Sequence, residues 1–167
     1  MEFEVNNIEE IVELIMKKMS ESSISTSSNS KNGVFENVDE AIAEAKKAQT
    51  ILFSSKLELR ERIIASIRET LKPYITELSE LAVKETGMGR VADKEIKNRI
   101  AIEKTPGLED LKAFAFSGDD GLTVMELSPY GVIGAITPST NPSETVICNS
   151  IGMIAAGNAV IFAPHPG

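Results

Sequence analysis

The chain has 167 residues, of which 42% are hydrophobic, enough to bury a core, and its 25 acidic residues exceed 17 basic ones to leave a net charge of −8. The acidic balance argues against non-specific nucleic-acid binding, which depends on cationic surface. One cysteine and one histidine exclude an internal disulfide framework and a typical zinc site. No apolar run approaches the roughly 20 residues that cross a membrane, so we expect no nucleic-acid, metal or membrane partner.

The first predicted element is an amphipathic helix over residues 6–20. A Ser-rich segment, residues 21–33, follows it and is typical of a flexible linker. A helix on such a tether has no core of its own to cover, so we expect it to bind a groove on a partner protein. It could instead pack on the body of the protein, whereas its mostly acidic polar face suits a membrane surface poorly. Its apolar residues form one stripe at helical spacing: Ile8, Ile11, Val12, Ile15, Met16 and Met19.

Residues 34–112 predict a layer of four helices. Asn37 or Asp39 is expected to cap the first helix, and Pro73 to lie in the first turn of the third. Gly87 should end that third helix, and the fourth should stop before Pro106. The expected spans are 38–53, 56–72, 73–86 and 91–104. The residues expected to face inward are Ala41, Ile42, Ala45, Ala48, Leu59, Ile63, Ile64, Ile67, Leu71, Leu78, Leu81 and Ala82.

The remaining segment, residues 113–167, contains no Lys or Arg, and a segment so poor in charge is expected to be buried between other layers. Residues 121–129 alternate like an antiparallel strand. A buried strand then begins near Gly131, a helix follows, and a turn at Gly157-Asn158 leads to a second buried strand. This order predicts an α/β fold with one βαβ unit, whose ligand-binding loop lies at the carboxyl end of the first strand.

Six motifs stand in a fixed order along residues 84–166: Lys84-Glu-Thr-Gly-Met-Gly-Arg90, Thr105-Pro-Gly-Leu-Glu-Asp110, Gly118-Asp-Asp-Gly-Leu-Thr-Val124, Pro129-Tyr-Gly-Val-Ile-Gly134, Thr137-Pro-Ser-Thr-Asn-Pro142 and Phe162-Ala-Pro-His-Pro166. Together they resemble CoA-acylating aldehyde dehydrogenases of the acetaldehyde or propionaldehyde type. The resemblance implies a helical layer followed by the first βαβ of a Rossmann-like coenzyme-binding domain, an incomplete aldehyde dehydrogenase fold. Residues 34–167 would then form this domain, after a targeting helix at 1–20 and a linker at 21–33.

The resemblance implies an enzyme that converts a short-chain aldehyde, CoA and NAD into acyl-CoA and NADH. In that chemistry a cysteine thiolate attacks the aldehyde, hydride leaves to NAD⁺, and CoA takes the acyl group from the resulting thioester. The developing oxyanion needs preorganised donors. Matching the family's two loop prolines to Pro138 and Pro142 makes Thr140 and Asn141 the candidate oxyanion donors, and the sequence does not choose between them.

The resemblance also implies a set of coenzyme contacts in two loops. Ala163 stands where ordinary family members carry a Lys that binds the adenosine ribose, and a smaller wall suits a site that must also accommodate CoA. The choice between NAD and NADP stays open. The implied cofactor-binding residues are Ile136, Thr137, Pro138, Ser139, Ala163, Pro164, His165 and Pro166.

Cys148 is not expected to be the nucleophile. It lies within an apolar helical stretch, and no basic residue is near it in sequence to lower its pKa, so we interpret it as a core residue. The resemblance implies that the nucleophilic cysteine belongs to a catalytic domain after residue 167, so the 167-residue chain alone should be inactive. Thr140 and Asn141 could also be ordinary turn formers, and His165 a loop residue without a role.

The detached helix at 6–20 resembles the encapsulation peptide of such enzymes in bacterial microcompartments. This resemblance implies a cytoplasmic protein inside a microcompartment, with shell or cargo proteins as partners and a homo-oligomeric full-length enzyme. One alternative is a non-catalytic remnant that binds shell proteins through this helix. Another is an ordinary non-acylating dehydrogenase, against which the Thr140-Asn141 loop and Ala163 both speak. The length of the aldehyde stays open.

Overall fold

The computed structural model describes residues 33–166, so the helix expected over 6–20 and nearly all of the predicted linker lie outside the described residues. Four helices, α2 (Val38–Ser54), α3 (Leu57–Leu71), α4 (Ile75–Thr86) and α5 (Val91–Lys104), fall within two residues of their predicted spans. A short 3₁₀ turn, η1 (Lys72–Tyr74), separates α3 from α4. Pro73 therefore lies in this turn and not, as predicted, in the first turn of α4.

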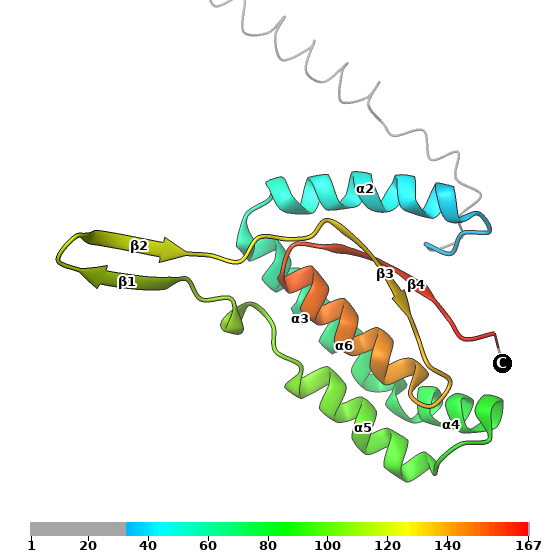
Figure 1. Cartoon of the computed structure of the whole chain (residues 1–167). Helices are drawn as coiled ribbons and strands as arrows, with labels where there is room; N and C mark the ends of the chain where they lie inside the picture. The colour runs from blue at the N-terminus through cyan, green and yellow to red at the C-terminus, as the bar shows by residue number, and fades with distance from the viewer. Residues whose placement is uncertain (1–32, 167) are drawn as a thin grey trace, which may run out of the picture. The chain divides into compact units, whose positions relative to one another are not determined.

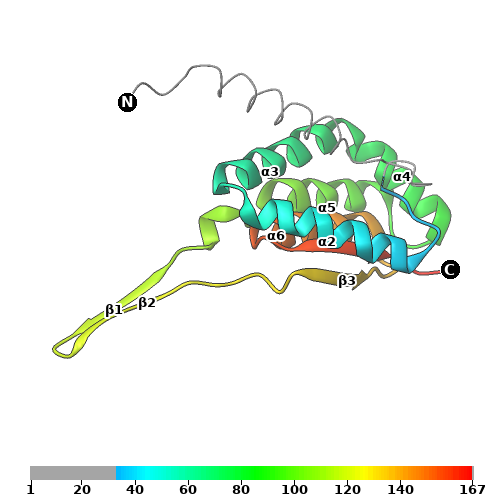
Figure 2. The same cartoon turned by 90° about the horizontal axis from the view of Figure 1, so that it is seen from above.

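The predicted βαβ unit is present as β3 (Val132–Ile136), α6 (Pro142–Ala155) and β4 (Ala159–Ala163). The two strands pair in parallel, in a register that runs from Val132 opposite Ala159 to Ile136 opposite Ala163. Helix α2 packs on one face of this pair and α6 on the other, and α3, α4 and α5 pack against α6 (Figures 1 and 2). The described residues thus form an α/β arrangement around a two-stranded parallel pair.

The core lies where α3, α4, α5 and α6 meet. Its most deeply buried members are Ile102 and Ile151, both with no exposed surface. Burying aliphatic side chains of this size stabilises the fold by about 1.5–3 kcal/mol each. The buried cluster consists of Ile64, Ile75, Ala101, Ile102, Ile147, Ile151 and Ala155.

Three residues expected to face inward do not. Ala48 and Leu59 are exposed, and Leu81 keeps 51% of its surface in solvent. In α4 the buried face passes through Ser79, whose hydroxyl donates to the Ile75 carbonyl (2.7 Å) and accepts from the Asn98 side-chain amide (3.0 Å). The buried side of α4 therefore includes a hydrogen-bonded polar group as well as apolar side chains.

The turn between α6 and β4 is held by two side chains from other elements and by one of its own. Gly157 adopts a left-handed backbone with φ of 81°, as expected for a helix-ending glycine. Arg60 donates to the Ala155 carbonyl (3.3 Å) and Gln49 to the Gly157 carbonyl (3.2 Å). The buried Asn158 accepts a hydrogen bond from the Gly131 backbone N–H (2.9 Å), which ties the end of the βαβ unit to its beginning.

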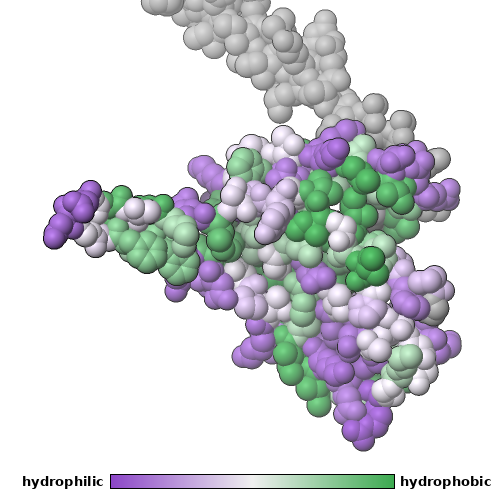
Figure 3. All heavy atoms as spheres, viewed as in Figure 1, coloured by the Kyte–Doolittle hydropathy of each residue, from purple (hydrophilic) through white to green (hydrophobic). Residues whose placement is uncertain are grey.

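An antiparallel hairpin precedes the βαβ unit and extends away from the helices (Figure 1). Its second strand, β2 (Gly121–Met125), lies within the predicted 121–129 strand, whereas its first, β1 (Phe114–Gly118), was not predicted. A 3₁₀ turn, η2 (Leu108–Asp110), leads into it. Every hairpin residue is exposed, so the burial expected for this charge-poor segment is wrong here. Figure 3 shows apolar surface on the hairpin, which includes Phe114, Phe116, Leu122 and Val124.

Candidate functional site

The two loops that the sequence assigned to coenzyme binding lie side by side. Because β3 and β4 are parallel and in register at Ile136 and Ala163, the loops 137–141 and 164–166 both start at the carboxyl end of the pair. The Thr137 backbone N–H donates to the Ala163 carbonyl (3.0 Å), which extends the ladder by one bond. This edge is the usual ligand-binding edge of a parallel α/β sheet.

The side chains at this edge differ in how far they are exposed to a ligand. Thr137 is 3% exposed, so its side chain is closed off, and its backbone N–H is already used by Ala163. Ser139 is half-buried, and Ile136 is 83% exposed although the preceding Ala135 is buried. The other predicted coenzyme contacts are all exposed at this edge: Pro138, Ala163, Pro164, His165 and Pro166.

Two lysines of helix α5 donate hydrogen bonds to the Thr140-Asn141 segment. The buried Lys94 donates from its ammonium to the Thr140 carbonyl (2.9 Å), and Lys97, one turn later, donates to the Asn141 side-chain oxygen (3.2 Å). The Asn141 amide nitrogen lies 3.5 Å from the Thr140 hydroxyl, to which it donates. Both candidate oxyanion donors are therefore present in one segment whose orientation two lysines set.

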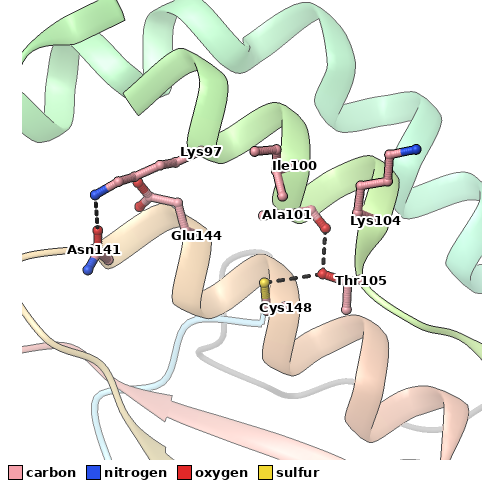
Figure 4. Close-up of a pocket in the computed structure, with 8 residues that line it drawn as sticks. All are labelled: Lys97, Ile100, Ala101, Lys104, Thr105, Asn141, Glu144 and Cys148. Carbon is pink, nitrogen blue, oxygen red and sulfur yellow. Dashed lines mark hydrogen bonds between the residues drawn. The ribbon is translucent and has the colours of Figure 1, made fainter. Parts of the chain in front are cut away.

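An open groove of about 290 Å³ separates α5 from α6 beside this segment (Figure 4). Asn141 lies at one end and Cys148 further along, so the Asn141 side chain faces the groove as well as the loop. The Cys148 sulfur accepts a hydrogen bond from the Thr105 hydroxyl (3.2 Å), and the residue packs against the buried core. The single hydroxyl proton of Thr105 is shared between this sulfur and the closer Ala101 carbonyl (2.7 Å).

Glu144, in the first turn of α6, is also buried at this groove, with 8% of its surface exposed. One carboxylate oxygen accepts from the Ser143 hydroxyl (3.2 Å) and the other has no hydrogen-bond partner within the described residues. An acidic side chain here interacts favourably with the positive end of the helix dipole. It also lowers the tendency of this helix end to attract a second anion.

Sequence reasoning missed Lys94 and Lys97. Their contacts with the loop span 46 and 44 residues, and no local pattern encodes such a pairing. One signal was available in α5, where the buried positions begin with two polar residues, Lys94 and Asn98, before Ala101 and Ile102. A lysine on the buried face of a helix is unusual enough to mark a specific partner.

Within residues 33–166, no helix combines the length and apolar character that a membrane crossing requires. In the same range no group of three His, Cys, Asp or Glu side chains is arranged to hold a metal ion.

Comparison with known proteins identifies the family to which this chain is similar. Residues 10–167 match the model of the aldehyde dehydrogenase family. The acetaldehyde dehydrogenase (acetylating) EutE of Salmonella typhimurium strain LT2 is 49% identical over 160 residues, which cover 96% of this chain and 34% of that protein. The chain thus spans about a third of the length of this curated relative.

Several solved structures resemble the described fold. The propionaldehyde dehydrogenase of Rhodopseudomonas palustris with bound propionyl-CoA has a TM-score of 0.78 and 54% identity, covering 81% of this chain and 30% of that one. A propionaldehyde dehydrogenase from the fucose utilisation bacterial microcompartment of Clostridium phytofermentans has a TM-score of 0.77 and 52% identity, covering 80% of this chain and 31% of the other.

Proposed function

Because the chain belongs to the aldehyde dehydrogenase family, we propose that it is the N-terminal part of a CoA-acylating, NAD-dependent aldehyde dehydrogenase. The whole enzyme converts a short-chain aldehyde and CoA into acyl-CoA while NAD accepts a hydride. The acetylating relative from Salmonella and the propionyl-CoA complex from Rhodopseudomonas support the acyl-transfer half of this proposal. The present chain contributes the coenzyme edge and the candidate oxyanion segment.

One observation carries the proposal: the pairing of Ile136 with Ala163. It brings the loop 137–141 and the loop 164–166 to one edge, although they are separated by a whole helix. Exposed Pro138 and Pro166 give the loops restricted backbones, which suits a surface that must hold a flat nucleotide ring without rearranging. The absence of a lysine at Ala163 leaves this surface open to CoA as well as to the coenzyme.

Thr140 or Asn141 supplies the oxyanion donor in this proposal. When bound, NAD accepts the hydride, and the protein supplies preorganised donors to the charge that develops on the aldehyde oxygen. Cys148 remains structural, because its sulfur is engaged by Thr105 and it packs on the core. The nucleophile then comes from the part of the enzyme that this chain does not contain.

We assign three segments: a targeting helix at 1–20, a linker at 21–33 and the N-terminal part of the coenzyme domain at 34–167. The helix addresses the enzyme to shell or cargo proteins of a bacterial microcompartment in the cytoplasm, and the full-length enzyme is a homo-oligomer. The microcompartment origin of the Clostridium relative supports this location. The targeting segment lies outside the described residues, and its apolar stripe and the Ser-rich linker in the sequence support its role.

A hybrid enzyme tests the catalytic proposal. It carries this chain in place of the matching N-terminal residues of the Salmonella acetaldehyde dehydrogenase. NADH formation is followed with acetaldehyde or propionaldehyde, with and without CoA. We expect CoA-dependent turnover from the hybrid and none from the 167-residue chain alone.

Two results would contradict the proposal. A folded hybrid that forms no NADH would show that this chain does not supply a working coenzyme edge. Turnover by the chain alone that disappears in Cys148→Ser would show that Cys148 is the nucleophile. A chain that is inactive in both settings but still binds shell proteins would instead favour the non-catalytic adaptor.

A further inference from the structure

Lys94 is an unusual residue to find in the interior of this fold. Only 3% of its surface is exposed, and it lies on α5 with its stem against the Gly87–Gly89 turn, where Lys94 Cε is 3.6 Å from the position of a Cβ at Gly89. Within residues 33–166 no ion pair of Lys94 is recorded, and its ammonium donates to one backbone carbonyl, that of Thr140.

Stability alone does not explain a lysine at this position. Removing an ammonium from water is costly, and one carbonyl acceptor offsets only part of that cost. A methionine has similar length and would fill the same space without a charge to bury. The lysine is therefore expected to contribute to geometry at the loop more than to the free energy of folding.

The contact fixes the orientation of one peptide group. No peptide bond in the described part of the chain is cis, so the Thr140 carbonyl and the Asn141 backbone N–H point in opposite directions across a rigid plane. With the carbonyl directed at Lys94 on α5, the Asn141 N–H is directed to the opposite side of the loop. The Thr140 hydroxyl is attached to the same constrained residue.

We propose that Lys94 is a positioning residue for catalysis: it orients the Thr140–Asn141 peptide and so aims the donors that this segment presents to the reacting aldehyde oxygen. The inference rests on the proposed function and deepens it, because it adds a residue that touches neither substrate nor coenzyme. Lys97 assists by holding the Asn141 side-chain oxygen, but from an exposed position.

The hybrid enzyme tests this role with Lys94→Met, Lys94→Arg and the control Arg99→Met, which removes an exposed charge from the same helix. A misplaced donor costs up to about 100-fold, and an interaction made only in the transition state lowers kcat without raising KM. We expect Lys94→Met to lose about 10- to 100-fold in kcat, with each KM within about threefold and an unchanged or higher Tm. Lys94→Arg should retain more activity than Lys94→Met.

The other possible outcomes either contradict the role of Lys94 or show that the proposed function itself is wrong. A kcat for Lys94→Met equal to that of Arg99→Met would overturn it, and so would a loss of kcat that follows a loss of folded protein. If the unmutated hybrid is inactive, the proposed function fails. The amide NMR spectrum of the 167-residue chain then tests whether Lys94 positions the Asn141 peptide. A shifted Asn141 amide in Lys94→Met but not in Arg99→Met supports positioning, whereas unchanged shifts in both refute it.

Discussion

The guanidinium of Arg60 lies across the backbone of Gly157. A Cβ added at Gly157 would stand 2.8 Å from Nη2 and 2.9 Å from Cζ of Arg60, closer than real carbon contacts allow. Arg60 is 8% exposed and donates to the Ala155 carbonyl at the end of α6. The turn that leads into β4 therefore favours glycine for its left-handed backbone, and any larger residue there would also have to displace the Arg60 guanidinium.

We predict that Gly157→Ala and Arg60→Ala interact in a double-mutant cycle. The left-handed backbone alone should cost Gly157→Ala about 1–2 kcal/mol, and displacing Arg60 from its carbonyl should add about 1–3 kcal/mol. In the Arg60→Ala background only the backbone cost should remain. Urea unfolding of the four proteins measures the coupling.

Gly87→Ala is the matched control for this cycle. Gly87 also has a left-handed backbone, with φ of 65°, but nothing lies within 4 Å of the added Cβ. Its cost should equal the backbone cost and should not change in the Arg60→Ala background. Strict additivity at Gly157 would mean that Arg60 moves aside freely.

Thr140→Ala and Asn141→Ala should affect the hybrid enzyme unequally. Removing the side chain that serves the oxyanion should cost about 10²–10³ in kcat, and removing the other should cost little. The larger loss is expected at Thr140, because Lys97 engages the Asn141 oxygen and the Asn141 side chain lines the groove. Wild-type kcat in both variants would exclude both side chains as donors and leave the Asn141 backbone N–H.

Glu109 should make folding stability dependent on pH in the acid range. A hydrogen bond from the Gly107 backbone N–H (2.9 Å) lowers the pKa of Glu109 below its ordinary 4.5, with a smaller contribution from the charge of Arg68. A carboxyl group with a lowered folded-state pKa contributes stability above its unfolded pKa, and this is lost as pH falls through the folded value. Glu109→Gln should therefore be less stable than the unmutated chain near neutral pH and approach it on acidification.

Urea unfolding at several pH values checks this prediction. The quantity of interest is the difference in unfolding free energy between the unmutated chain and Glu109→Gln at each pH. The difference should be constant above the unfolded pKa and shrink below it. A difference that does not vary with pH would show that the Gly107 contact does not depend on the charge of Glu109.

Residues 1–20 should be sufficient to target another protein to microcompartments. Residues 1–20 fused to a fluorescent protein should enter assembled microcompartments, because the spacing of six apolar residues from Ile8 to Met19 predicts one apolar helix face for a partner to bind. Ile11→Glu with Ile15→Glu should abolish entry, since each places a charge in the apolar seam. Diffuse fluorescence from the unmutated fusion in cells with assembled shells would show that the stripe does not bind there.

The helices and the βαβ unit could be predicted from sequence because local chemistry marks their ends. Gly87 ends α4 with a left-handed backbone, as its position after a hydrophobic stripe indicated. Gly157-Asn158 separates α6 from β4 for a related reason. The edge formed at Ile136 and Ala163 followed from the βαβ order, because parallel strands place their carboxyl ends together.

What was missed depends on contacts between distant residues. The bond between Lys94 and the Thr140 carbonyl spans 46 residues, and a local pattern does not pair residues that far apart. Leu81 was placed inside by helix periodicity, but it is exposed, and the buried side of α4 includes Ser79, which is hydrogen-bonded to Asn98. The first hairpin strand was missed although the Asp120-Gly121 pair that follows it is a hairpin turn signal.

The exposure of the hairpin also indicates which strands should unfold locally first. A two-stranded ribbon with solvent on both faces is marginally stable in water, whereas β3 and β4 lie between α2 and α6. Amide hydrogens of β1 and β2 should therefore exchange through local opening, long before those of β3 and β4, which require disruption of a packed layer. If an apolar surface of a partner binds Phe116 and Val124, the amide hydrogens of the ten residues of β1 and β2 should exchange more slowly.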